Sequence, residues 1–525
     1  METTQDPYVA FLAEVHAGFM SGSLKSKDDL QKLKMELASK YSLSRIPSDV
    51  EILNCLPATP EEKKLFRIKR TRTISGVAVV AAMTSPEACP HGKCIYCPGG
   101  PDINSPQAYT GHEPAALRGR THNYDPYNQV FHRLAQLETI GHDVSKVDLI
   151  VMGGTFTART AEYQNGFVKG CFDAMNRSLS GSLDESMHLN EHSARRCVGI
   201  TVETKPDWFM EKDIDIALSY GTTKVELGAQ IINDRILKLN HRGHGIEEIR
   251  KSTQLARDAG LKIVYHLMPG MYGAEPGNDV DSFRKVCEDQ DFRPDMLKIY
   301  PTLVVKGTSL YRLWKAGRYT PPTTDEVTSL LTEFMKMIPP WMRIQRVQRD
   351  IPVPFIVAGC KRSDIRNIVE RKARLTGVRI SEIRAREVGI DSVSPHGNLS
   401  RVRRDFAAGN GHEVFLSEED PEGHVAGYLR LRNPSRDPHR PEMEDSSIVR
   451  EIKVVGEALP IGAKPEGQWQ HRGIGKDLIA WAEEITSGEF DKRRLLIISG
   501  VGVRDYFRKL GYERVGPYMS KLLSG

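Results

Sequence analysis

Six short apolar runs between residues 75 and 310 constrain the fold more than any other feature of this chain. Each has the length of a β-strand, and stretches with helical spacing separate them. Strands joined by helical crossovers form a parallel sheet, so we predict an α/β fold built on a partial (βα)6 barrel. The runs are Val77–Ala82, Val147–Met152, Val198–Glu203, Lys224–Gly228, Lys262–Leu267 and Met296–Tyr300.

The residues at the far ends of these runs predict where ligands bind. In a parallel barrel, ligands bind at the carboxyl ends of the strands. A glycine pair and several polar side chains fall there, and we expect Lys298 to take part in catalysis and the others to bind cofactor. The candidates are Gly153, Gly154, Glu203, Gln230, His266 and Lys298.

Three cysteines within nine residues, Cys89, Cys94 and Cys97, form a candidate metal site. Three thiolates can hold three irons of a [4Fe-4S] cluster and leave the fourth iron open for a substrate. A zinc site with His91 as the fourth ligand fits the spacing equally well. The Gly153-Gly154 turn favours iron, because bare backbone there could bind the amino group of S-adenosylmethionine at the open iron.

The rest of the composition predicts a soluble, cytoplasmic protein with no membrane partner. No run approaches the ~18 apolar residues of a membrane span, and the first residues lack the pattern of a signal peptide. The eight cysteines, none after Cys360, fit reduced thiols and a metal site better than a disulfide framework. A chain of 525 residues also predicts more than one domain.

Positive charge is concentrated in two segments. Residues 63–72 hold six basic residues and no acid, and residues 361–387 hold nine basic and four acidic residues. The net charge of the whole chain is only +5. Concentrated cations with interleaved apolar residues favour a nucleic-acid partner, because each neutralised phosphate releases counterions. A solvated helix face is the alternative interpretation of either segment alone.

The last ~135 residues predict a second, α+β domain. Three strand-like runs, Glu413–Ser417, Val425–Leu431 and Ile448–Val455, precede a glycine-rich helix start at residues 470–476. Glycines there expose backbone N–H groups at the positive end of the helix dipole, which suits a pyrophosphate such as that of acetyl-CoA. Tyr506 could protonate a departing thiolate, because a phenol keeps its proton at neutral pH.

Several motifs in the chain resemble the catalytic subunit of Elongator, from about residue 60 to the end and in the family's order. Besides the cysteine motif CPHGKCIYCPGG and VMGGTF, these are RTISGV at 72–77, YTGHEP at 109–114, GHDVSK at 141–146, TKPD at 204–207, LKIYPTLV at 297–304, VQRDIP at 347–352 and WQHRGIG at 469–475.

This resemblance implies a radical S-adenosylmethionine (SAM) domain fused to a GNAT-type acetyltransferase domain. The implied activity is formation of 5-carboxymethyluridine at wobble uridine 34 of tRNA. A 5′-deoxyadenosyl radical would abstract hydrogen from the methyl group of acetyl-CoA, the carbon radical would add to the uracil, and thioester hydrolysis would follow. The implied partners are the tRNA anticodon stem-loop and other Elongator subunits.

We assign a helical, tRNA-binding region (1–65), a radical SAM domain (66–315), a basic linker (316–390) and an acetyltransferase domain (391–525).

The resemblance also assigns residues. Cys89, Cys94 and Cys97 match the cluster ligands, and Lys146 matches a lysine that holds acetyl-CoA from the radical domain. The remaining acetyl-CoA residues that we expect are Glu451, Ile452, Lys453, Val454, Gln470, Gly473, Ile474, Gly475, Lys476, Tyr506 and Phe507.

Three departures from the family pattern affect these assignments. The family's adjacent tyrosines are Tyr506-Phe507 here, which leaves one hydroxyl for proton transfer. Residues 451–454 read EIKV where ELHV is common, so an imidazole is missing. Some members carry a cysteine-rich zinc site between the domains, but residues 380–387 read ISEIRARE, so we expect no zinc there.

Two alternative functions stay open at this point. A protein lysine acetyltransferase with a structural iron–sulfur domain would work without SAM, but it leaves the three cysteines without a chemical purpose. A non-catalytic tRNA-binding scaffold would bind RNA in a salt-sensitive way without consuming acetyl-CoA.

Overall fold

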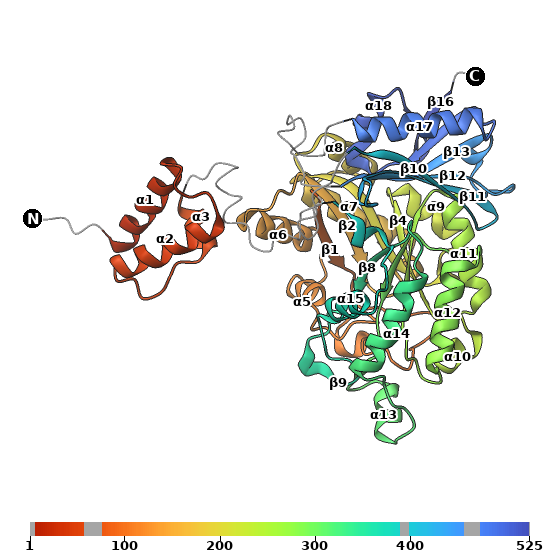
Figure 1. Ribbon diagram of the computed structural model, residues 1–525, viewed down its shortest axis with the longest axis horizontal. Coiled ribbons are helices and arrows are strands. Elements are labelled where there is room, and N and C mark those ends of the chain that lie inside the picture. Colours follow the sequence, from red (N-terminus) through yellow and green to blue (C-terminus); the bar gives the residue numbers. More distant parts are fainter. Residues whose placement is uncertain (1–5, 57–75, 389–397, 456–472, 524–525) are drawn as a thin grey trace, which may run out of the picture.

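A computed structural model describes residues 6–56, 76–388, 398–455 and 473–523. One of its two seven-stranded sheets is parallel, in the order β1-β2-β3-β4-β5-β6-β8, and contains all six expected strands (Figure 1). The bounds are β1 Ala78–Met83, β2 Lys146–Met152, β3 Arg196–Thr204, β4 Lys224–Gln230, β5 Lys262–Leu267, β6 Met296–Ile299 and β8 Arg343–Val347.

A seventh strand, β8, joins the six expected strands. It lies within residues 316–390 and pairs in parallel with β6, so this part of the expected linker belongs to the barrel sheet, while Glu387 near the end of the segment forms a bridge with Val425 of the C-terminal sheet. The sequence of β8, RIQRV, holds only two apolar residues, three positions apart, and the surrounding basic charge concealed it as a strand. The same segment forms α14 Thr324–Met337, β9 Ile356–Ala358, α15 Ile365–Leu375 and α16 Ile383–Arg386.

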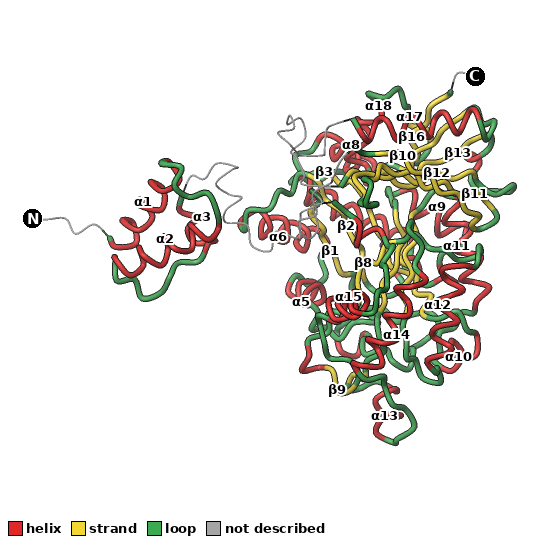
Figure 2. Tube along the Cα trace, in the orientation of Figure 1, coloured by secondary structure: helices red, strands yellow, loops and turns green. Residues whose placement is uncertain are grey.

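Helices cover the outer face of the barrel sheet, as Figure 2 shows in red around the yellow strands. The strands and helices share one large apolar core, in which Val80, Leu149, Val202 and Val225 are fully buried. The helices are α5 Pro114–Thr121, α6 Pro126–Thr139, α7 Ala161–Asn176, α8 Leu183–His192, α9 Glu211–Ser219, α10 Asp234–Leu239, α11 Ile246–Asp258, α12 Pro276–Glu288 and α13 Ser309–Lys315, and a short strand, β7 Val304–Val305, pairs with β9.

The N-terminal region forms three helices that stand to one side of the barrel (Figure 1). They are α1 Pro7–Met20, α2 Lys27–Lys40 and α3 Asp49–Cys55. Ser26 caps α2, since its hydroxyl accepts a hydrogen bond from the Asp29 N–H. These helices have a small apolar core of their own around Phe11, Val15 and Leu30.

The C-terminal residues form a second seven-stranded sheet, in the order β10-β11-β12-β13-β14-β16-β15. Within it β13 and β14 are parallel, but they pair only over residues 446–449 and 494–497, and the rest of β13 pairs with β12 alone. The elements are β10 Ser400–Ala408, β11 Gly411–Glu419, β12 Val425–Asn433, β13 Ser446–Val454, α17 Ile474–Gly488, β14 Arg494–Ile498, α18 Arg504–Arg508, β15 Glu513–Val515 and β16 Tyr518–Leu522.

A buried network of ion pairs joins the two sheets. Arg432 on β12 binds Asp258 of α11 at 2.6 Å, and Arg450 on β13 binds Asp295, which precedes β6, at 2.6 Å. All four side chains are at most 2% exposed. The C-terminal sheet therefore packs near the amino ends of the barrel strands, opposite the ends where a ligand is expected.

Candidate active site

The three cysteines lie in the loop that follows β1, and hydrogen bonds hold their sulfur atoms in place. Cys89 Sγ lies 3.3 Å from Thr155 Oγ1. The Ala108 N–H donates to Cys97 Sγ at 3.0 Å, and the Arg242 guanidinium donates to Cys94 Sγ at 3.3 Å. Burial raises the pKa of the free Cys97 thiol to about 11, so a bound metal is needed to keep it as a thiolate at neutral pH.

The spacing of the sulfur atoms favours a cluster over a single zinc ion. Ligands of one tetrahedral zinc, each about 2.3 Å from the metal, lie within about 4 Å of one another. Among the described residues, the three Sγ atoms do not all lie within 4.8 Å of one another. No two of them do so together with a ring nitrogen of His91 either. His91 Nε2 does lie 3.2 Å from Cys94 Sγ. The wide spacing of the thiols suits a larger metal cluster.

The Gly153-Gly154 turn contacts the cysteine loop, as the sequence predicted. Gly154 has φ +84°, and a Cβ placed there would lie 3.7 Å from Cys89 Sγ. Gly153 has φ +152°, and its Cβ would lie 1.8 Å from Thr84 Oγ1. Side chains at both positions are therefore excluded, which leaves bare backbone beside the thiols.

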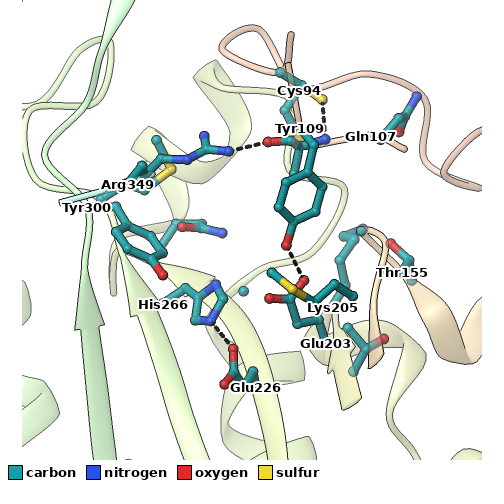
Figure 3. A pocket seen from close by; sticks show the side chains of 18 of the residues that line it. Cys94, Gln107, Tyr109, Thr155, Glu203, Lys205, Glu226, His266, Tyr300 and Arg349 are labelled. Atoms are coloured by element: carbon teal, nitrogen blue, oxygen red, sulfur yellow. Dashed lines mark hydrogen bonds and ion pairs between the residues drawn. The ribbon is translucent and has the colours of Figure 1, made fainter. Parts of the chain in front are cut away.

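The predicted polar residues gather in the same pocket, at the carboxyl ends of β3 to β6 (Figure 3). His266 Nε2 lies 2.7 Å from Glu226 Oε2, and Lys298 forms an ion pair with the same carboxylate. Burial alone would lower the pKa of Lys298, but Glu226 outweighs it and raises that pKa well above its usual value. Lys298 therefore keeps its proton at neutral pH, as the positive half of its ion pair with Glu226.

Sequence reasoning identified Glu203 but missed its partner, Tyr109. The Tyr109 hydroxyl donates to the Glu203 carboxylate, and Arg349 donates to the carbonyl of Ala108 (Figure 3). Burial, followed by the charge of Glu203, raises the pKa of Tyr109 well above its usual value. Tyr109 and Arg349 lie in the motifs YTGHEP and VQRDIP, which carried the family resemblance but gave no role for either residue.

Gln230 is a predicted residue of this pocket with an unsatisfied group. Its Oε1 is buried and has no hydrogen-bond partner among the described residues. Its backbone is in the left-handed region, with φ +66°, which non-glycine residues rarely adopt. A buried acceptor that lines a pocket is available for a donor group of a ligand.

A second group of predicted residues meets at the start of α17. Gly473 caps this helix with φ +94°. A Cβ on Gly475 would lie 3.3 Å from Tyr506 Oη, and it would contact Val454 and Ile452 at 3.7 and 3.9 Å. The Tyr506 hydroxyl thus lies beside the first turn of the helix, next to the place where β13 and β14 separate.

Other predicted residues of this group are placed differently. The side chains of Glu451 and Lys453 bind Arg430 and Glu387, both at 2.9 Å, so they take part in ion pairs rather than in the space beside Gly475. Phe507 is buried, and Lys476 is exposed. Ile474 is buried against Gly427, and Gln470 and the basic segment 63–72 lie outside the described residues.

Lys146 and the glycine turn lie at opposite ends of one strand. Lys146 begins β2, and Gly153 follows its last residue. The seven residues of β2, at about 3.3 Å each, separate the two ends by about 23 Å. Lys146 pairs in the sheet with Arg196, which contacts Gly502 of the C-terminal domain. Lys146 therefore lies on the acetyltransferase side, and the two predicted sites do not converge.

Family models match most of the chain. The "ELP3 N-terminal domain" matches residues 8–74, the "Radical SAM superfamily" matches residues 83–282, and the "Radical_SAM C-terminal domain" matches residues 294–374. The last range includes β8, in agreement with its place in the barrel sheet.

Relatives of nearly the same length extend this match. The chain is 45% identical to "tRNA uridine(34) acetyltransferase" of Methanocaldococcus jannaschii, over 96% of both chains. The chain belongs to the Elp3 family. It is also 40% identical to "Elongator complex protein 3" of Homo sapiens, over 94% of this chain and 93% of that one. The solved structure of Methanocaldococcus infernus Elp3 with an N-terminal deletion is 42% identical, with a TM-score of 0.77 over 86% of this chain and 100% of that chain.

Membership of the Elp3 and radical SAM families implies a [4Fe-4S] cluster and SAM as cofactors. The residues of the pocket fit both groups. Three separated thiols are the donors that a cluster with one open iron needs, and the bare Gly153-Gly154 backbone lies beside them. In the described residues, no helix is long and apolar enough to cross a bilayer.

Proposed function

We propose that this chain forms 5-carboxymethyluridine at wobble uridine 34 of tRNA from acetyl-CoA and SAM. The observation that carries the proposal is the pocket in which three cysteines, a glycine turn and the polar strand ends of β3 to β6 meet. This pocket occurs in a chain that is 45% identical to a protein named for uridine 34 of tRNA.

In the radical half of the reaction, Cys89, Cys94 and Cys97 hold the cluster, and Gly153 and Gly154 hold the methionine end of SAM. Cluster and SAM together supply a carbon-centred radical. Gln230 Oε1, a buried acceptor, binds an N–H or O–H of a ligand in the pocket. Lys298 keeps its proton because of Glu226, so it stabilises negative charge or donates a hydrogen bond to a carbonyl oxygen of the substrate.

In the acyl half, the first turn of α17 binds the pyrophosphate of acetyl-CoA and Tyr506 acts on the thioester. Support comes from the start of α17 at Gly473, where the helix dipole is positive, and from the parallel pair β13 and β14, which separates beside it in the manner expected of a GNAT-type domain. Burial raises the pKa of Tyr506, so the phenol is protonated at neutral pH and serves as a proton donor to the leaving thiolate.

The macromolecular partners belong to the same proposal. The chain binds the anticodon stem-loop of tRNA, with phosphates held by the N-terminal region and the basic segments. Because the human and fly relatives are named as Elongator complex proteins, other subunits of that complex are proposed partners, in the cytoplasm.

The test is to measure modified uridine and acetyl-CoA hydrolysis together. Anaerobically reconstituted protein is incubated with tRNA, SAM and acetyl-CoA, and nucleosides are analysed by mass spectrometry. We expect 5-carboxymethyluridine from the wild type and none from Cys94→Ala. Acetylated peptide formed without SAM would support the protein acetyltransferase instead, and tRNA binding without acetyl-CoA turnover would support the scaffold.

The tRNA interface has its own test. Replacing Lys69, Arg70 and Arg72 with alanine should weaken binding of different tRNAs about equally and flatten its dependence on salt, since phosphate contacts carry no sequence information. Unchanged binding would remove this segment from the interface.

A further inference from the structure

A second concave surface lies on the outside of the barrel, between α10 and α13. We call it the basic recess. Its volume is about 740 Å3, and no aspartate or glutamate lines it. The basic side chains that line it are Arg235, Lys238, His241, Arg312 and Arg318.

Among the described residues, the arginines and the lysine of the basic recess form no ion pair with an acidic side chain, and two of them have uncharged partners. Arg235 donates to the carbonyl of Gly273 at 3.0 Å, and Arg312 donates to Ser309 Oγ at 2.9 Å. Neither contact neutralises a positive charge. Elsewhere on the surface, basic side chains pair with carboxylates; Arg284, for example, forms an ion pair with Asp281 at 2.9 Å. The recess therefore presents an uncompensated positive field to a binding partner.

The floor of the basic recess is apolar. Leu239, Leu313, Tyr272 and Ala316 line it between the cations, and Leu239 is 39% exposed. An apolar centre with a charged rim is the usual anatomy of a protein–protein interface. An RNA backbone would use the rim but would leave the apolar floor in contact with water. The surface therefore suits a protein with an acidic rim better than it suits RNA.

The wall of the basic recess is the cysteine loop itself. Ile95 lines the recess and lies in the chain between Cys94 and Cys97. Its N–H donates to the Asn240 carbonyl at 3.3 Å, directly after α10, and its own carbonyl accepts from the N–H of Leu310 in α13 at 2.7 Å. A protein bound in the recess is thus separated from the cysteines by a single layer of chain, on the side away from the substrate pocket.

We propose that the basic recess docks a small acidic one-electron carrier protein that reduces the cluster. The carrier gives up one electron and the oxidised cluster accepts it, with no bond made and no proton moved, after which the oxidised carrier leaves. The substrate pocket stays free for SAM and the substrate. This inference rests on the radical chemistry of the family and is independent of the identity of the RNA substrate.

The test measures binding first and reduction second. Two acidic carriers, a flavodoxin and a plant-type ferredoxin, serve as probes against the reconstituted chain. Binding is measured by calorimetry at low and high salt for the wild type and for Lys238→Glu/Arg312→Glu. The matched control is Lys212→Glu/Lys251→Glu, which makes the same change of charge on α9 and α11. Iron content and circular dichroism check that each variant is folded and loaded.

We expect at least one carrier to bind the wild type more weakly as salt rises. The recess variant should bind it at least about tenfold more weakly, since like charges then face each other, and the control should match the wild type. Bleaching of the cluster absorbance by the reduced carrier should slow in the recess variant only. Bleaching by dithionite, a small molecule that needs no docking, should be equal in all three proteins.

Three results would overturn the proposal: binding of neither carrier, equal loss in the recess and control variants, or loss of anticodon stem-loop RNA binding while carrier binding is kept. The last would make the recess an RNA surface. Failure of the tRNA reaction alone would leave the carrier measurements unaffected, so the two proposals fail separately.

Discussion

Replacing Asp295 with asparagine should strongly destabilise the contact between the two sheets. Asp295 is 1% exposed and accepts hydrogen bonds from Arg450 at 2.6 and 2.8 Å and from the Ile263 N–H at 2.8 Å. Burial would raise its pKa, but Arg450 and Arg430 outweigh this and hold the pKa well below its usual value. The substitution removes one negative charge and leaves these arginines buried without full compensation.

Breaking a buried ion pair in this way costs about 3–5 kcal/mol. With a urea m-value of about 3 kcal/mol/M, the unfolding midpoint falls by about 1–1.7 M. The control is Asp445→Asn, which breaks a pair of the same chemistry with Arg493, whose side chain is 86% exposed. That pair is worth about 0–1 kcal/mol. Unfolding in urea is followed by tryptophan fluorescence. Equal unfolding midpoints for the two variants would show that the buried network does not hold the domains together.

Three further predictions concern the sites and the pH dependence. Tyr506→Phe should lower acetyl-CoA hydrolysis about 10²–10⁴-fold while SAM cleavage, measured as 5′-deoxyadenosine, is unchanged. Gly153→Ala should abolish SAM binding in calorimetry, because its Cβ would lie 1.8 Å from Thr84 Oγ1, whereas Gly166→Ala, with open space around it, should not. Burial raises the pKa of Asp279 to about 7, so the folded state keeps a proton that the unfolded chain loses near pH 4. Stability therefore falls as the pH rises between these values. In Asp279→Asn this fall should be absent when the urea midpoints at about pH 4.5 and about pH 8 are compared.

Local patterns in the sequence were enough to predict the barrel strands and the cysteine pocket. The apolar runs identify β1 to β6, and the residues just after them meet because parallel strands end at one edge. What could not be predicted depends on partners far away in the chain. Arg349 contacts Ala108 across 241 positions, and no local pattern marks either residue for that contact.

The interface between the sheets was hidden for the same reason. Arg430 and Arg432 alternate with apolar residues on β12, which normally indicates a strand with one face in water. Both are at most 1% exposed, because carboxylates of the barrel lie opposite them. The sequence shows the charge of these residues but not the surface that neutralises it, so a buried face was indistinguishable from a solvated one.

The separation of the two sites constrains how the reaction can proceed. Tyr506 and Lys146 lie on one side of the barrel and the cysteines on the other, about 23 Å apart along β2. A swing of the C-terminal domain toward the cysteines would break the ion pairs of Arg432 and Arg450, each buried and each costing several kcal/mol to separate. Under the proposed function, the acetyl group rather than the domain would therefore move between the two ends of the barrel, and the radical and acyl halves should be separable by substitution.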